Sequence, residues 1–358
     1  MFKKVAIIYL LWGDEPKKYL VRTLVSVNRQ SYDKTNLSLI IPYNPTETTN
    51  QLAFIEATVA EYKDKISIKI LPQTSNIGFS AGNNVGIQFA LDHGADYIFL
   101  HNGDGYLSDT SIEEIVRVMV SDETIGQVQS MILLNNQPDK INTSGDCWQY
   151  LGIGYCRDYQ KNLSEFKNSG EIGYASGTAT LMRADLLKKY GLWSNDFFLY
   201  HEDVDYSLRL RSLGYKIVLA EKSIFYHDYE FGRNKKKYFW LERNRYAIKL
   251  IYYKIPTLVL LLPLEILYNF GLIFFAFFSG WFLDLLRVYV YWLQPKNWTT
   301  WLVLRKKIQT GRVIKDKDLL RQAVNTVNTE QIGSKFILLP ANIVFAVYGF
   351  LLRLVVWW

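Results

Sequence analysis

Short apolar runs alternate with amphipathic stretches through the first hundred residues of this 358-residue chain. The expected strands are Val5–Leu11, Leu37–Pro42, Ile66–Leu71 and Tyr97–Leu100, and the expected helices between them are Lys17–Arg29, Thr49–Lys63 and Ser80–His93. This alternation predicts an α/β fold, with a mostly parallel sheet flanked by helices. Because such sheets bind ligands outside the carboxyl ends of their strands, the residues that follow each strand are the candidates for function.

The C-terminal third has a different composition. Ile255–Phe282 contains one formally charged residue, Glu265, and Phe336–Trp358 contains only Arg353. Both runs are long enough to cross about 30 Å of hydrocarbon. Buried core helices of a soluble domain are the alternative, but the aromatic density favours a membrane. A helix lying in the membrane plane is equally compatible, with Glu265, Asp284 and Arg287 as its polar stripe.

The net charge of +7 is unevenly distributed. Up to Gly232 there are 22 basic and 28 acidic residues, a net of −6, whereas from Arg233 onward there are 19 and 6, a net of +13. The basic residues flank the apolar runs, which indicates contact with anionic membrane lipids rather than with nucleic acid. The two cysteines are too few for a disulfide framework.

Four short segments carry polar residues next to predicted strands. Asn76–Gly86 is glycine-rich and opens a helix, a place that favours phosphate. Asn102 and Asp104 follow the fourth strand, where a carboxylate suits Mg²⁺ or Mn²⁺ carrying a diphosphate, although a ligand-free turn has the same residues. His227 follows the expected strand Lys216–Ala220 and is a candidate metal or diphosphate ligand.

The fourth segment, Phe197–Arg211, places three acids behind an expected aromatic strand. Helix capping would need only one acid, so Glu202 and Asp203 indicate a site with a general base, whereas Asp205 is better explained as a cap.

In this order, the motifs resemble the family 2 glycosyltransferases of the GT-A fold, particularly their rhamnosyltransferase-like branch. The resemblance covers about residues 3–250. It includes the N-x-G-F-x-x-G-N-N-x-G segment at Asn76, a D-x-D-type position at 102–104, a donor-sugar loop within Gly173–Arg183 and an F-x-Y-x-E-D-x-D-x-x-x-R segment at Phe198. Glu242–Arg245 resembles the R-N segment that leads into C-terminal membrane-associated helices.

The resemblance implies a GT-A domain over 1–250 and a membrane-associated helical region over 251–358, with a basic linker at 296–321. It assigns Asp203 as catalytic base, Glu202 as the residue that positions the acceptor or sugar, and Asp104 and His227 as metal ligands. The implied donor-binding residues are Trp12, Asn76, Gly78, Asn83, Asn84, Asn102, Gly177 and Thr178.

The sequence departs from the family pattern at three places. Asn102 replaces the first acid of the D-x-D pattern and Gly103 the usual proline. The second strand ends in Pro42-Tyr43-Asn44, without the acid that contacts the base or ribose in the family. Trp12-Gly13-Asp14 replaces the commoner T-Y-N, and Trp12 remains able to pack against the base.

The resemblance therefore implies an inverting transferase that depends on Mg²⁺ or Mn²⁺. Its donor would be dTDP-rhamnose or a UDP-sugar. Its acceptor would be a hydroxyl of a lipid-linked glycan, such as a polyprenyl-diphosphate saccharide, or of a cell-surface glycan. The catalytic domain would lie on the cytoplasmic face of the cell membrane. Two alternatives are a catalytically inactive nucleotide-sugar-binding scaffold and a nucleotidyltransferase, although no G-G-x-G-x-R-type loop is present.

Overall fold

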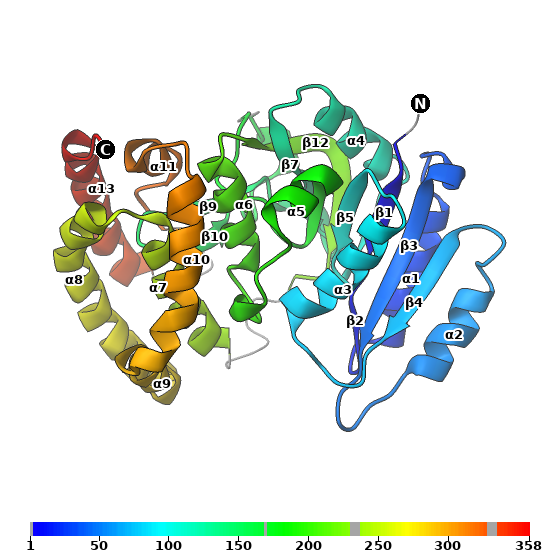
Figure 1. Cartoon of the computed structure of the whole chain (residues 1–358), viewed down its shortest axis with the longest axis horizontal. Helices are drawn as coiled ribbons and strands as arrows, with labels where there is room; N and C mark the ends of the chain where they lie inside the picture. The colour runs from blue at the N-terminus through cyan, green and yellow to red at the C-terminus, as the bar shows by residue number, and fades with distance from the viewer. Residues whose placement is uncertain (1–2, 168–169, 230–236, 328–334) are drawn as a thin grey trace. The chain divides into compact units, whose positions relative to one another are not determined.

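The chain folds into two compact units that interleave along the sequence (Figure 1). The computed structural model describes residues 3–167, 170–229, 237–327 and 335–358. Unit 1 consists of Met1–Gly145, Arg157–Phe198 and Lys216–Tyr229, and unit 2 of Asp146–Cys156, Leu199–Tyr215 and Glu230–Trp358. The expected boundary at residue 250 stays a prediction.

Unit 1 is built on one sheet. Its strands are β1 (Val5–Ile8), β2 (Leu11–Trp12), β3 (Leu37–Asn44), β4 (Ser67–Pro72), β5 (Tyr97–His101), β6 (Gly105–Leu107), β7 (Ile125–Leu134), β8 (Gln137–Thr143), β11 (Ala179–Arg183) and β12 (Lys216–His227). Its helices are α1 (Lys17–Asn28), α2 (Leu52–Ala60), α3 (Phe79–Asp92), α4 (Ser111–Val120) and α5 (Ala184–Tyr190), with short 3-10 turns η1 (Lys34–Asn36), η2 (Leu163–Glu165) and η3 (Asn195–Phe197). The strand order is β2-β3-β1-β5-β11-β7-β12-β6, with β4 beside β3 and β8 beside β7.

The α/β class with a mostly parallel sheet is confirmed, and the sheet also contains antiparallel pairs. Strand β1 pairs in parallel with β3 and β5, whereas β11 lies antiparallel between β5 and β7. This reversal has a consequence for the site. Because Ala179 of β11 pairs with His101 of β5, the loop that enters β11 lies at the carboxyl end of β5.

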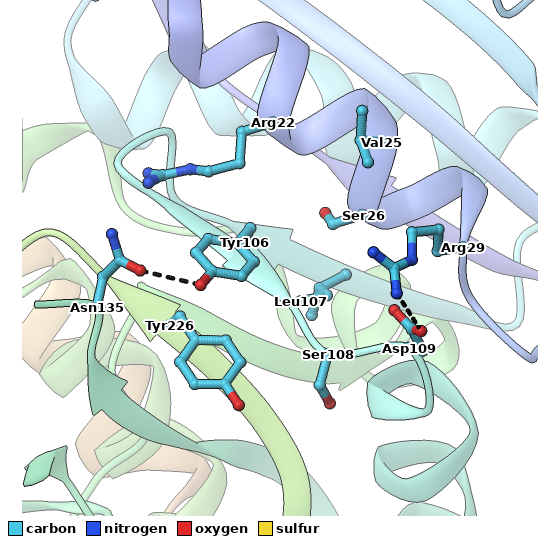
Figure 2. Close-up of a pocket in the computed structure, with 10 residues that line it drawn as sticks. All are labelled: Arg22, Val25, Ser26, Arg29, Tyr106, Leu107, Ser108, Asp109, Asn135 and Tyr226. Atoms are coloured by element: carbon cyan, nitrogen blue, oxygen red, sulfur yellow. Dashed lines mark hydrogen bonds and ion pairs between the residues drawn. The ribbon is translucent and has the colours of Figure 1, made fainter. Parts of the chain in front are cut away.

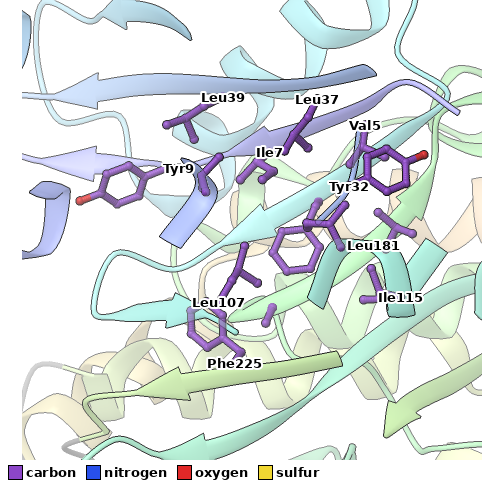
Figure 3. Close-up of a cluster of buried hydrophobic side chains, with 14 of the residues drawn as sticks. Val5, Ile7, Tyr9, Tyr32, Leu37, Leu39, Leu107, Ile115, Leu181 and Phe225 are labelled. Atoms are coloured by element: carbon purple, nitrogen blue, oxygen red, sulfur yellow. The ribbon is translucent and has the colours of Figure 1, made fainter. Parts of the chain in front are cut away.

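One core cluster of unit 1 lies where α1 and α4 pack against the sheet. Leu20 and Leu24 of α1 and Ile112 and Ile115 of α4 are buried in one cluster with the strand residues that Figure 3 shows. Each such side chain contributes roughly 1.5–3 kcal/mol by leaving water. This packing makes a rigid support for the strand ends.

Three expectations about local structure need correction. The run Val5–Leu11 splits into β1 and β2, and β2 continues beside β3 at Tyr43 and Asn44. The strand expected to end at Ala220 continues to His227, so this histidine is the last residue of β12. The expected aromatic strand before Glu202 is instead the turn η3 followed by residues with positive φ.

Unit 2 is mainly helical. It contains the hairpin β9 (Asp146–Gln149) and β10 (Ile153–Cys156), and the helices α6 (Glu202–Ser212), α7 (Lys237–Tyr252), α8 (Ile255–Ser279), α9 (Phe282–Leu293), α10 (Trp298–Gly311), α11 (Asp316–Gln322) and α13 (Lys335–Val355), with the turn η4 (Pro295–Asn297). Both apolar runs are therefore helices. By length and composition alone, α8 and the segment Leu338–Val355 of α13 are long and apolar enough to cross a membrane.

Candidate active site

Asp104 and His227 meet at the strand ends of unit 1. Strand β12 pairs antiparallel with β6, so His227 lies opposite Gly105 and beside the turn that joins β5 to β6. The Nε2 atom of His227 is 2.8 Å from Oδ1 of Asp104, and its Nδ1 atom is 2.7 Å from Oδ1 of Asn142. The Asn102 amide donates a hydrogen bond of 2.6 Å to the same Asp104 oxygen.

This arrangement suits a divalent cation. With Nδ1 donating to the Asn142 oxygen, a cation between Nε2 and the carboxylate would take the place of the proton of a hydrogen bond there. The separation of 2.8 Å is close to the roughly 2.9 Å between adjacent ligands of a cation bound at 2.0–2.1 Å. Burial alone would raise the pKa of Asp104, but the neighbouring His227 outweighs it and lowers the pKa, so the carboxylate is ionised.

Chain residues supply only part of a coordination shell. No cluster of three or more His, Cys, Asp or Glu side chains suited to a metal occurs among the described residues. Asp104 and His227 therefore leave most positions for other ligands, as in sites where Mg²⁺ bridges one or two side chains and substrate phosphates.

Glu15 is a site neighbour that the sequence did not reveal. Its carboxyl group is buried, accepts a hydrogen bond from the Tyr9 hydroxyl, and occupies the space that a Cβ atom at Gly103 would need. The family's usual proline at 103 would therefore overlap Glu15. Burial raises the pKa of Glu15 to about 8, and the Asp104 charge adds to the increase, so Glu15 is mainly neutral at pH 7.

Asn44 joins the strand end of β3 to the glycine-rich segment. Its amide donates to the Gly78 carbonyl at 3.2 Å and contacts the Asn76 Oδ1 at 3.4 Å, and Asn76 in turn accepts from the Gly78 amide at 2.9 Å. Gly78 has φ +90, and the Phe198 ring fills the position of its missing Cβ. Trp12, on β2 next to Asn44, is 46% exposed and free to stack on a flat ligand.

The expected donor-sugar loop lies beside the segment that carries Asp104. The backbone N–H of Asn102 donates to the Thr178 carbonyl at 2.9 Å, which links the end of β5 to the start of β11. A Cβ at Gly177 would meet the ring of Trp193 and approach that of Phe79 at the start of α3. Contacts within unit 1 therefore connect these residues in series, from Trp12 through Asn76, Gly78, Gly177 and Thr178 to Asn102, and their role in donor binding stays a prediction.

Asn83 and Asn84, also expected to bind the donor, have side chains that form hydrogen bonds within the protein. Asn83 is buried and donates to the Phe79 carbonyl within α3. Asn84 accepts from the Trp193 amide and donates to the Trp193 carbonyl and to Asn195, so it holds α3 against the 193–195 segment. Their role in donor binding stays a prediction, and their observed contacts are structural.

The acidic segment belongs to unit 2, where it begins α6. Glu202 is buried, and within the described part of the chain its Oε2 atom has no hydrogen-bond partner. Burial, and then the Asp203 carboxylate, raise the pKa of Glu202 well above its usual range. Asp203 is half-buried and accepts from the Val204 amide at 2.8 Å. The two neighbouring acids therefore have different environments: Glu202 is buried and has a raised pKa, whereas Asp203 is more accessible.

Asp205 is not the cap of α6, because His201 occupies that position. Its carboxylate is ion-paired with Arg209 and accepts from the Tyr252 hydroxyl of α7 at 2.7 Å. All three side chains are buried. Asp205 therefore joins α6 to α7 and is not available to a substrate.

Helix α7 also holds the turn that precedes the acids. Phe198, Tyr200 and His201 all have positive φ, which is strained for residues with side chains. The Asn244 amide donates to the carbonyl of Leu199 at 3.0 Å and to that of Tyr200 at 2.7 Å. Asn244, in the Arg-Asn segment, therefore supports this turn, which the sequence alone did not reveal.

A cavity of about 600 Å³ lies elsewhere in unit 1 (Figure 2). Arg22 of α1 borders it, stacks on Tyr106 at 4.9 Å and pairs with Asp228 at 3.0 Å. Asp228 follows His227, but its carboxylate is bound by Arg22 and by Asn135. Asp104 and His227 do not line this cavity.

The sheet and its flanking helices are of the GT-A type. Residues 8–247 match the model of the family described as glycosyltransferase like family 2, and the chain belongs to this family. It is similar to the low-salt glycan biosynthesis hexosyltransferase Agl10 of Haloferax volcanii, with 23% identity over 149 residues. That match covers 40% of this chain and 46% of the relative, so the chain spans about half the length of that protein.

Two solved structures align with this chain. The crystal structure of GalNAc-T7 with UDP, GalNAc and Mn²⁺ aligns over 70% of this chain and 50% of that chain, with 13% identity and a TM-score of 0.54. The mannosyltransferase PcManGT of Pyrobaculum calidifontis, in complex with GDP-Man and Mn²⁺, aligns over 99% of this chain and 88% of that chain, with 11% identity and a TM-score of 0.49.

Proposed function

We propose that this glycosyltransferase moves a sugar, with inversion, from a nucleotide-diphosphate donor to a hydroxyl group of a glycan. The observation that carries the proposal is the contact of Asp104 with His227 at the strand ends of unit 1. In a sheet of this kind, ligands bind at that edge. A carboxylate and an imidazole directed at one another there form a partial cation site, and a diphosphate would complete it.

Mg²⁺ or Mn²⁺ is the cofactor of this proposal, held by Asp104 and His227. When bound, the cation neutralises the charge that develops on the departing diphosphate. The similar fold of GalNAc-T7, solved with UDP and Mn²⁺, supports this assignment. Asn142 orients the His227 ring, and Asn102 holds the Asp104 carboxylate.

The donor would lie along the connected residues from Trp12 to Asn102. We propose that Trp12 stacks on the base and that the loop at Gly177 and Thr178 receives the sugar. No acid stands at the end of β3, where the family's acid contacts the base or ribose, so recognition there would rest on uncharged groups such as the Asn44 amide. The resemblance to the rhamnosyltransferase branch makes dTDP-rhamnose the first donor to test, followed by UDP-sugars.

Asp203 is our candidate for the general base. In the step proposed, the acceptor oxygen bonds to C1 of the sugar, its proton passes to the Asp203 carboxylate, and the bond from C1 to the diphosphate oxygen breaks, which releases the nucleoside diphosphate. Asp203 is the more accessible of the two acids, and Glu202, whose pKa burial raises, would position the acceptor or sugar beside it.

The acceptor we propose is a lipid-linked glycan, such as a polyprenyl-diphosphate saccharide, or a cell-surface glycan. The two long apolar helices, the basic residues that flank them and the similarity to a glycan-biosynthesis hexosyltransferase support a location at the cell membrane. The catalytic unit would face the cytoplasm, where nucleotide sugars are available.

Binding and transfer assays with a panel of nucleotide sugars test the proposal. Mn²⁺ affinity in the presence of the nucleoside diphosphate should fall at least about tenfold in Asp104→Asn and in His227→Gln, as expected for loss of one ligand. Asp109→Asn, which removes an exposed ion pair with Arg29 in the same unit, is the matched control and should keep wild-type affinity.

Three outcomes would contradict the proposal. Unchanged Mn²⁺ affinity in both variants would remove the cation site. Donor binding without hydrolysis or transfer, for every donor and acceptor tried, would indicate a nucleotide-sugar-binding scaffold. Transfer of a nucleotidyl group instead of a sugar would indicate a nucleotidyltransferase.

A further inference from the structure

The middle of α8 is bound to a charged helix. Glu265 pairs with Arg245 of α7 at 2.7 Å and with Lys249 of the same helix. Four residues further along α8, Asn269 accepts a hydrogen bond from Tyr246. Helix α8 therefore lies along α7. Its polar residues Glu265 and Asn269 contact that helix, whereas the sequence predicted that Glu265 would belong to a stripe exposed to water.

Helix α7 is part of the interior of unit 2. Through Asn244 it holds the turn at Leu199 and Tyr200, and through Tyr252 it binds Asp205 of α6. Its residues Glu242, Arg243, Arg245 and Lys249 are buried against protein. An element so connected to α6 cannot sit among lipid chains.

These contacts decide how α8 can meet a membrane. Glu265 lies ten residues after Ile255, about 15 Å along the helix, which is half the thickness of the hydrocarbon core. If α8 crossed the bilayer, Glu265 and its partners on α7 would lie near the midplane. The acidic turn before α6, which α7 binds, would then also lie within the hydrocarbon. Charged groups and irregular backbone are costly at that depth even when protein buries them. An in-plane α8 avoids this cost, because α7 and the acidic turn of α6 then stay outside the hydrocarbon.

The opposite side of α8 is apolar and exposed. Its exposed residues recur every three or four positions and are Val259, Leu262, Ile266, Phe270, Phe274 and Phe277. Helix α13 lies beside α8, since the Tyr348 hydroxyl donates to the Leu260 carbonyl and the rings of Tyr268 and Phe345 are 6.4 Å apart. It carries a similar stripe, which includes Ile343, Val347, Phe350 and Leu354.

We propose that the exposed stripes of α8 and α13 lie in the plane of one leaflet of an anionic phospholipid bilayer, so that the enzyme is monotopic. The inference rests on the membrane location proposed above and adds the mode of attachment. Charge supports the choice of partner: Lys254 is the N-cap of α8, and Lys315 contacts the Trp357 ring just after α13. Basic and aromatic residues at the margins of an apolar face fit the headgroup region.

Depth measurements on the full chain distinguish this mode from spanning. Single cysteines would be introduced by Val259→Cys, Phe270→Cys and Phe277→Cys after Cys147→Ala and Cys156→Ser, and each labelled with an environment-sensitive fluorophore. Vesicles of phosphatidylcholine and phosphatidylglycerol would carry quenchers either near the headgroup or deep in the acyl chains. For an in-plane helix, all three positions are quenched alike, and more strongly by the shallow quencher. A spanning helix gives deep quenching at position 270 and shallow quenching at 259 and 277, which would overturn the inference while leaving the membrane location intact.

Flotation with the same vesicles tests the apolar face itself. Phe274→Asp should lower the partition coefficient at least about tenfold, because a buried Phe side chain is lost from the lipid phase. Val120→Asp on α4 is the matched control, since the two side chains are exposed to 53% and 52%. Wild-type protein that does not float would refute both the membrane location and the docking surface. A dimer that forms without lipid and shields position 270 would assign the face to a second copy of the chain and overturn the inference.

Discussion

Glu15→Gln should make the protein more stable at pH 8 and leave its stability nearly unchanged at pH 4. The substitution keeps an acceptor oxygen for the Tyr9 hydroxyl and changes the size of the side chain little. What it removes is the carboxyl proton. The effect should therefore be read from its dependence on pH, since the new amide hydrogens contribute the same free energy at every pH.

The magnitude follows from the pKa of about 8 that burial gives to Glu15, against an ordinary value of 4.5. Below pH 4.5 the carboxyl is protonated in both folded and unfolded chains, so its contribution is fully present. Between pH 4.5 and about 8 only the unfolded chain ionises, and the wild-type protein loses about 1.4 kcal/mol per pH unit. The total is at most about 5 kcal/mol, or a shift of about 10 °C in the unfolding temperature of a domain this size.

The assay is thermal unfolding of wild type and variant from pH 4 to 8.5, with chelator present so that no cation binds near Asp104. The difference in unfolding temperature should grow with pH and level off above pH 8. Glu56→Gln, an exposed glutamate on α2, is the control and should show a difference that does not vary with pH. A constant difference between Glu15→Gln and wild type over the whole range would show that Glu15 ionises in the folded protein, and would refute the burial argument.

Three further substitutions test the acids and the glycine-rich turn. Asp203→Asn should reduce transfer by at least about 100-fold with donor affinity retained, because a positioned base contributes 10²–10⁴-fold to the rate, whereas Glu202→Gln, which keeps a hydrogen-bond donor, should lose less; the reverse order in single-turnover assays would move the base to Glu202. Gly78→Ala should weaken the nucleoside diphosphate affinity and destabilise the fold by about 1–3 kcal/mol, since φ is +90 and the Phe198 ring fills the Cβ position; an unchanged unfolding temperature would contradict that steric account.

The elements with strong periodicity were predicted well. Helices α1 and α3 and strands β3 to β5 lie within a few residues of their expected bounds, because each buries an apolar face that its own sequence displays. The sequence also predicted the end of α3 at Gly94. The structure agrees, because Gly94 follows the C-cap of α3 and has φ +77. The antiparallel insertion of β11 was not predicted, because a five-residue apolar strand shows no direction in its sequence.

The candidate site divides in the same way. Asp104, His227 and Asn102 were recognised from residue types at strand ends, and the structure brings these three together. Glu15 and Asn44 were missed, since nothing in the local sequence shows that an acid 88 positions before Gly103 fills the space beside it. The role of Asn244 was equally hidden, because its hydrogen bonds reach carbonyl groups 44 and 45 residues away.

The sequence by itself determined the α/β class, the family, the segments that supply the acids and the presence of two long apolar helices. These properties depend on local periodicity and on the order of motifs, which a chain carries without being folded. Only the tertiary structure decided that Glu15 is neutral, that Asp205 is committed to Arg209 and Tyr252, and that Glu265 binds α7. Burial and pairing set those properties, and both depend on contacts between residues far apart in the chain.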